Sequence, residues 1–240
     1  MQVEYLNKLS APMRAFVEEV EDGAGLAVEV VPQAELNHGG PAGQGKLSIE
    51  IESQSVRLNV PTNGYFPDGA VRHEVLHMRR LHVEHVPRLA IAEAADWDAV
   101  FESGLTHVDN ALEHLAIVPV ELHHHPERHV HWERVMRHAW EVKVPQAAAL
   151  DRQIGACLHW TFLRHVIPTS AVLGLAVSVL NAHNLREEAN SFADQLLARL
   201  GDKAEVARLF FDWFTDVPRE RVALEYLNSV TGTTQHPIPG

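Results

Sequence analysis

His73, Glu74 and His77 form the pattern His-Glu-x-x-His. If this segment is helical, the two histidines lie about 40° apart around the axis and about 6 Å apart along it, so both imidazoles can reach one metal ion. Glu74 then projects toward the adjacent flank, where it can take a proton from a metal-bound water without being a ligand itself. The spacing therefore predicts a metal site with Glu74 as general base.

Histidine is unusually frequent in this chain, with 17 residues in 240, and 12 of them lie between His73 and His138. Because of this surplus, a shuffled chain of the same composition contains the pattern about 0.1 times, so the motif needs support from its surroundings. The run His123-His124-His125 precedes Pro126 and is expected in a loop, where successive side chains diverge. We interpret this run as a solvated loop that binds metal weakly at most, rather than as a second metal site, and a position within the triplet could still line the active-site cleft.

The elements that must position the motif follow from hydrophobic spacing. Apolar residues at helical intervals predict an amphipathic helix over residues 3–20, and a strand is expected over 26–31. Residues 47–52 and 56–60 alternate apolar with polar side chains, which indicates a hairpin with one buried face. After Asp68 only helices are expected, over residues 69–84, 97–117, 129–142, 146–166, 169–183, 185–200, 203–215 and 218–229. The predicted fold class is α+β, with a mixed domain over 1–144 and an all-helical C-terminal domain over 145–240.

This order of elements resembles the minimal core of zincin-type metallopeptidases, in which a small twisted sheet packs on the HExxH helix and a second helix supplies the last ligand. The resemblance covers roughly residues 1–120. In gluzincin-type zincins a glutamate on a downstream helix is the third zinc ligand, and the resemblance assigns this role to Glu113. The Asn-Glu-x-x-x-Asp form of the larger gluzincin families is absent from this sequence.

Two other residues near Glu113 are candidates for the third position, because a catalytic zinc site uses three protein ligands and keeps one position open. Asp109 lies four residues before Glu113, on the same face of the expected helix, and would accept a hydrogen bond from a ligand imidazole. The roles of these two acids could be exchanged. His114 lies about 100° around the helix from Glu113 and could instead be a ligand or stabilise an oxyanion.

The resemblance implies a zinc metallopeptidase with one ion, although other divalent metals also fit two histidines and a carboxylate. Zinc lowers the pKa of its bound water to about 7, and Glu74 would remove the proton before the hydroxide attacks a carbonyl. The strand over residues 56–60 would hold an extended peptide by main-chain pairing, so the expected substrate is a peptide or protein. The alternative is a non-catalytic zincin scaffold that senses metal or binds a partner.

Composition excludes several other classes. The net charge of −12, from 20 basic and 32 acidic residues, argues against a nucleic-acid partner, because phosphate binding needs a concentrated basic field. Cys157 is the single cysteine, so it is expected to be a small buried side chain rather than half of an intrachain disulfide. The N-terminus lacks the features of a secretory signal, and the longest mostly apolar stretch, residues 171–180, is too short to span a bilayer. We therefore expect a cytoplasmic protein without a membrane segment.

Overall fold

The computed structural model describes residues 1–38 and 43–240 and has mixed, mostly helical α+β architecture, which confirms the predicted class. Contacts divide the chain into two units. Unit 1 contains Met1–Arg88 and Glu225–Gln235, and unit 2 contains Leu89–Leu224 and His236–Gly240. The predicted domain boundary after residue 144 does not coincide with this division, because it falls within the short helix α6 (Val144–Gln146) of unit 2.

Unit 1 begins with α1 (Val3–Leu6) and α2 (Ala11–Ala24), which together replace the single helix expected over residues 3–20. Pro12 lies in the first turn of α2, where a residue without an N–H group is tolerated. The predicted apolar stripe of α2 is buried. The helix ends at Gly25, whose φ of +65° is left-handed and costs a glycine little.

A three-stranded sheet follows, with the order β1-β3-β2. Its strands are β1 (Val28–Gln33), β2 (Ser48–Ile51) and β3 (Val56–Pro61). The predicted hairpin is confirmed, since β2 pairs antiparallel with β3, while β1 pairs with β3 in parallel. The expectation that residues 56–60 hold a substrate peptide is wrong, because β3 is the central strand and both of its edges are already paired.

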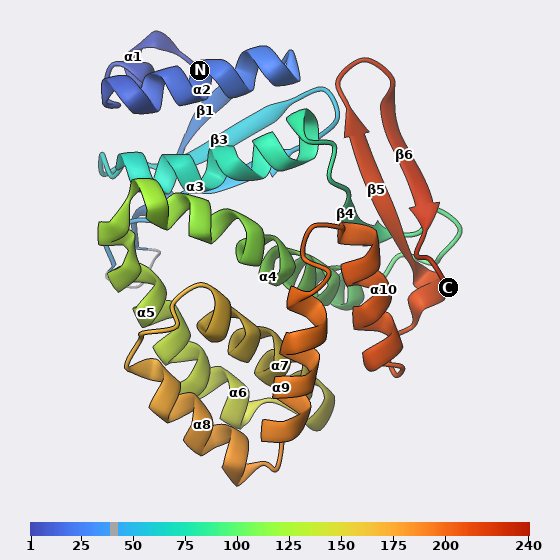
Figure 1. Ribbon diagram of the computed structural model, residues 1–240. Helices are drawn as coiled ribbons and strands as arrows, with labels where there is room; N and C mark the ends of the chain where they lie inside the picture. The colour runs from blue at the N-terminus through green and yellow to red at the C-terminus, as the bar shows by residue number, and fades with distance from the viewer. Residues whose placement is uncertain (39–42) are drawn as a thin grey trace. The chain divides into compact units, whose positions relative to one another are not determined.

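The HExxH segment lies on α3 (Asp68–Met78), which continues into the π-helical turn η2 (Arg79–Val83), close to the predicted span 69–84. Helices α2 and α3 belong to the same unit as this sheet, and α3 packs against α2 and β2 (Figure 1). Asp68 begins the helix, where a negative charge is favourable, and its carboxylate accepts hydrogen bonds from Ser10. These contacts fix the start of α3 against the N-terminal end of α2.

Unit 2 contains the long helix α4 (Ala99–His124), which exceeds the predicted span 97–117. Its N-terminus is capped by Asp98, whose side chain accepts hydrogen bonds from the backbone N–H groups of Val100 and Phe101. The helix continues through Pro119, whereas the predicted helix ends two residues before this proline. As a result, His123 and His124 lie in its last turn rather than in the expected loop.

The remaining helices of unit 2 lie close to their predicted positions. They are α5 (His129–His138), α7 (Ala149–His165), α8 (Val172–Ala182), α9 (Arg186–Leu197) and α10 (Lys203–Trp213). Helix α7 packs against α4, α8 and α9, which makes it the centre of the helical core (Figure 1). Cys157 of α7 is fully buried, as predicted, and burial raises the pKa of its thiol. None of the helices in the described part of the chain combines the length and apolar character needed to cross a membrane.

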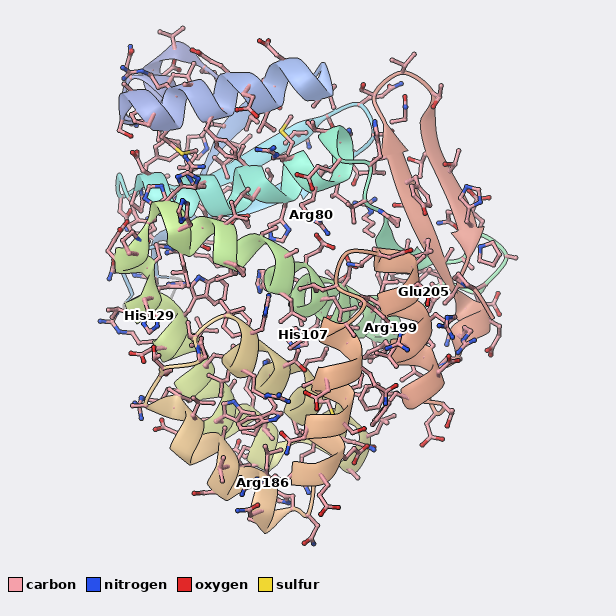
Figure 2. All side chains as sticks on the ribbon, viewed as in Figure 1. Arg80, His107, His129, Arg186, Arg199 and Glu205 are labelled. Atoms are coloured by element: carbon pink, nitrogen blue, oxygen red, sulfur yellow. The ribbon has the colours of Figure 1, made fainter. Side chains whose placement is uncertain are left out.

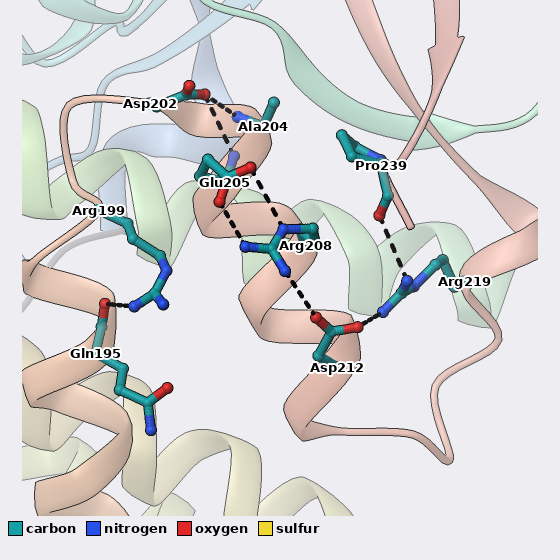
Figure 3. A network of polar contacts seen from close by, with 9 residues as sticks. All are labelled: Gln195, Arg199, Asp202, Ala204, Glu205, Arg208, Asp212, Arg219 and Pro239. Carbon is teal, nitrogen blue, oxygen red and sulfur yellow. Dashed lines mark hydrogen bonds and ion pairs between the residues drawn. The ribbon is translucent and has the colours of Figure 1, made fainter.

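The outer face of α10 carries a chain of ion pairs, which Figure 3 shows from close by. Arg208 contacts Glu205 and Asp212, and Asp212 also pairs with Arg219. Arg219 in turn donates a hydrogen bond of 3.4 Å to the carbonyl oxygen of Pro239. Together these contacts connect α10 to the segments at both ends of the C-terminal hairpin.

The expected helix over residues 218–229 is wrong, as is the expectation of no strand after Asp68. The structure has a second sheet in the order β4-β5-β6, with β4 (Arg88–Ile91), β5 (Val222–Asn228) and β6 (Gly232–Pro237). The first four residues of β5 are all buried, so the strand lacks the alternating pattern that identifies a half-exposed strand. The turn after β5 is held by the side chain of Asn228, which accepts hydrogen bonds from two backbone N–H groups.

Candidate metal centre

The two motif histidines lie on one side of α3, as the spacing predicts. Their ring centroids are 5.1 Å apart, with the rings nearly perpendicular. His73 is buried, whereas Glu74 and His77 are partly exposed. The helix therefore presents two imidazoles and a carboxylate within little more than one turn.

The opposite side of α3 explains why the motif is held in this orientation. Val71, Val75 and Met78 are fully buried and follow helical spacing. His73 lies about 200° around the helix from Val71, so burial of the apolar stripe turns the histidines away from it. The local sequence thus fixes the direction of the motif as well as its spacing.

A third histidine completes a group with ligand geometry. One ligand nitrogen from each of His73, His77 and His114 lies within 4.8 Å of the other two, so the three residues are close enough to bind one metal ion. Across residues 1–38 and 43–240, this is the one group of three or more metal-ligating side chains at such distances. His114 comes from α4 and is one of the open alternatives for the third ligand.

Glu113, the residue to which the resemblance assigns the third ligand, lies in a different cluster. Its Oε1 atom is 2.7 Å from the Nζ atom of Lys203, at the start of α10, and both side chains are about 95% buried. Glu113 is not a member of the three-histidine group. The expectation that it is the third zinc ligand stays a prediction, and the structure gives its carboxylate an ion-pair role.

Asp109 belongs to the same cluster, which confirms that the two acids share a face of α4. Its Oδ1 atom is 2.7 Å from Nζ of Lys203 and accepts a hydrogen bond of 3.1 Å from the backbone N–H of Leu89. Burial raises the pKa of Asp109, and Glu113 adds to this effect while Lys203 opposes it. Burial alone would lower the pKa of Lys203, but the two carboxylates outweigh it and the net shift is upward.

Sequence reasoning missed Lys203, although a signal for it was present. Lys203, Val206, Ala207 and Phe210 follow the spacing of one buried helical stripe. A lysine in such a stripe is rarely buried unless it has a partner. The pattern therefore indicates a buried ion pair, and the two acids spaced four residues apart on α4 are suitable partners.

The other histidines have structural contacts or remain exposed. His82 is 4% exposed, its Nε2 atom lies 3.0 Å from the carbonyl oxygen of Glu52, and burial lowers its pKa. His123 and His124 stack edge to face at the exposed end of α4. Figure 2 labels His107 on α4 and His129 at the start of α5. Neither belongs to the three-histidine group.

The three histidines and Glu74 supply neutral nitrogen donors and one carboxylate base. Imidazole suits zinc and several other transition metals, so this donor set fits the predicted ion without selecting it uniquely. Three protein ligands also leave room for a water molecule, as in catalytic zinc sites. Comparison with protein-family models, curated proteins and solved structures finds no match to this chain.

Proposed function

We propose that the protein is a metal-dependent hydrolase that binds one divalent ion, zinc in the first instance, through His73, His77 and His114. The observation that carries this proposal is the approach of three ligand nitrogens to within 4.8 Å of one another, beside a glutamate in the HExxH position. His114 takes the third position in place of Glu113, because the Glu113 carboxylate is engaged by Lys203.

A bound zinc ion supplies a Lewis acid that lowers the pKa of a ligated water and polarises a carbonyl oxygen. Glu74 follows His73 directly in the helix and is partly exposed, so it can accept the proton of such a water. The same carboxyl can then donate this proton to the leaving nitrogen. His73 is buried on the histidine side of α3, and this burial restricts its ring to few orientations.

The proposed substrate is a peptide, and the structure changes which strand is suited to hold it. Strand β2 is an edge strand because, among the described residues, it pairs only with β3, and α3 packs against it. The C-terminal end of β2 is covered, since Arg88 donates to the carbonyl oxygen of Ile51 and His82 contacts that of Glu52. Pairing of an extended peptide would therefore use the N-terminal part of β2.

Metal content tests the ligand set. We expect about one equivalent of zinc in the purified protein, and loss of that metal in His73→Ala, His77→Ala and His114→Ala. His138→Ala is the matched control, because His138 is exposed on α5 and lies outside the group. Metal retained by His114→Ala but lost from Glu113→Gln would reject His114 and restore the glutamate ligand. Circular dichroism of each variant separates metal loss from unfolding.

Glu74→Gln tests hydrolysis separately from binding. We expect this variant to keep its metal and to lose cleavage of a quenched fluorescent peptide library by at least about 100-fold, the usual contribution of a general base. Glu18→Gln, an exposed acid on α2, should retain full activity. A metal-loaded wild-type protein that cleaves no peptide would contradict the hydrolase and favour a metal-binding scaffold.

A further inference from the structure

A surface hollow in unit 2 is lined by none of the three grouped histidines, and its side chains differ in chemistry from that group. It has a volume of about 800 Å³ and is lined by the segment that precedes α4 and by Glu220 and Arg221, just before β5. Two of its lining residues are alanines, and the others include Asp96, Trp97 and Asp98. The hollow therefore combines one large aromatic side chain with several charged groups.

Trp97 is exposed to an extent unusual for this residue type. All five tryptophans lie in the described residues, and Trp97 is 70% exposed, whereas Trp132, Trp140 and Trp160 are each 7% exposed or less. Its indole N–H donates a hydrogen bond of 3.0 Å to Glu102, which restricts the ring. Val100, three residues further along the chain, is also highly exposed. An ordered aromatic ring in a hollow is typical of a protein interaction surface.

Arg221, the cation among the described residues that line the hollow, is already engaged. Its guanidinium lies 4.4 Å from the ring centroid of Phe101 and donates to the carbonyl oxygen of Asp96. It also lies within 3.7 Å of the Asp98 carboxylate, which caps α4. Arg221 and Asp98 therefore largely satisfy each other and the adjacent backbone.

Two carboxylates of the hollow remain available. Within the described part of the chain, the side chains of Asp96 and Glu220 make no hydrogen bond or ion pair. Together with Trp97, they offer an aromatic face flanked by negative charge. This combination favours a cation, because the face of an indole ring attracts positive charge and carboxylates attract it more strongly.

We propose that this hollow binds an arginine side chain from a basic segment of a partner protein. The guanidinium would stack on the Trp97 ring and pair with Asp96 or Glu220. Arginine is favoured over lysine because its planar group can stack and form paired hydrogen bonds at once. The negative charge of the hollow would repel nucleic acids and anionic lipid surfaces. The protein's own net charge of −12 makes a second copy of this chain a poor occupant.

Fluorescence anisotropy of a labelled peptide, acetyl-Gly-Arg-Gly-Arg-Gly-amide, tests this inference with the full chain. The matched probe carries citrulline in place of arginine, which keeps the shape and removes the charge. We expect the arginine peptide to bind and to quench part of the protein's tryptophan emission, and the citrulline peptide to bind at least about fivefold more weakly. Equal binding of the two peptides would reject a cation site.

Variants then place the binding in the hollow. We expect Trp97→Ala to weaken binding about two- to fivefold, and the combination with Asp96→Asn and Glu220→Gln to weaken it more than about tenfold. Glu127→Gln, an exposed acid elsewhere in unit 2, should leave binding unchanged. Binding that is the same in the triple variant and in the wild type would overturn the proposal. The three side chains are exposed, so their replacement is expected to leave the fold intact.

Binding should also depend on salt. Because the proposed ion pairs are solvent exposed, raising the ionic strength from about 0.05 to about 0.5 M should weaken binding of the arginine peptide several-fold. Binding that is insensitive to salt would indicate apolar docking on Trp97 and Val100 and would contradict the proposed guanidinium partner. Metal content and peptidase activity are not involved in this test, so its outcome is independent of the proposed hydrolase.

Discussion

The histidine side of α3 and the acidic face of α4 carry pairs of side chains with the same helical spacing. The histidine pair is placed to bind a metal ion, whereas the acidic pair is engaged in an ion pair. On α3, His73 and His77 lie four residues apart and keep ring nitrogens near a third histidine. On α4, Asp109 and Glu113 also lie four residues apart, but both contact the ammonium group of Lys203. Spacing predicts which side chains meet, whereas the identity of the facing residue decides whether the pair is available to a ligand.

Replacing Lys203 should have the largest effect on this contrast. In Lys203→Met, two buried carboxylates lose their cation, so we expect the free energy of unfolding to fall by about 3–5 kcal/mol. Urea denaturation followed by circular dichroism measures the change. A triple variant that also carries Asp109→Asn and Glu113→Gln should recover much of the loss, because it removes the uncompensated charge. A loss below about 1 kcal/mol in the single variant would mean that the cluster is better hydrated than its burial indicates.

Asp109→Asn should have a smaller effect, because Lys203 keeps Glu113 as a partner. The amide oxygen introduced by this substitution can still accept a hydrogen bond from the backbone of Leu89, so we expect a loss of about 1–2 kcal/mol. Zinc content should be unchanged, since Asp109 lies outside the three-histidine group. Thermal unfolding and elemental measurements check the two expectations. Loss of metal without loss of stability would show that the acidic cluster supports the metal site.

His159 of α7 is not a predicted metal ligand, and its titration is expected to affect the stability of the protein. Burial, with smaller contributions from His107 and Lys143, lowers its pKa to about 4. Since the unfolded chain binds this proton near pH 6.5 and the folded chain does not, stability should fall as pH drops from about 6.5 to about 4 and then level off. We expect a loss of about 1–3 kcal/mol across that window.

His159→Leu separates this effect from the titration of other groups. The variant should have a flatter dependence of unfolding free energy on pH between about 4 and about 6.5 than the wild type. His138→Leu, at an exposed position, should keep the wild-type slope. Identical slopes in wild type and His159→Leu would mean that folding does not lower the pKa of His159.

The exposed ion pairs of α10 should matter least. Arg208→Ala removes contacts with Glu205 and Asp212 on a solvated surface, where such pairs contribute little. We expect the thermal midpoint to match that of the wild type within experimental error. A clear decrease would show that the network in Figure 3 acts cooperatively through Arg219.

Local patterns in the sequence predict the helix that carries the motif, the closeness of its two histidines on that helix and the hairpin before it. These features depend on residues close in sequence, such as the apolar stripe of α3. The ion pair of Glu113 cannot be predicted from local patterns, because its partner Lys203 is 90 residues away. Strand β5 is easily mistaken for a helix because burial on both faces removes its alternation.

The π-helical turn after α3 has a consequence for changes in chain length. A π turn contains one residue more than an α-helical turn, and η2 follows directly after the motif. Deleting one residue there would convert the turn to ordinary helix and displace His82 from the carbonyl oxygen of Glu52. The interval between His73 and His77 would stay the same, since both precede the turn. A deletion between His73 and His77 would instead rotate one histidine about 100° around the helix relative to the other.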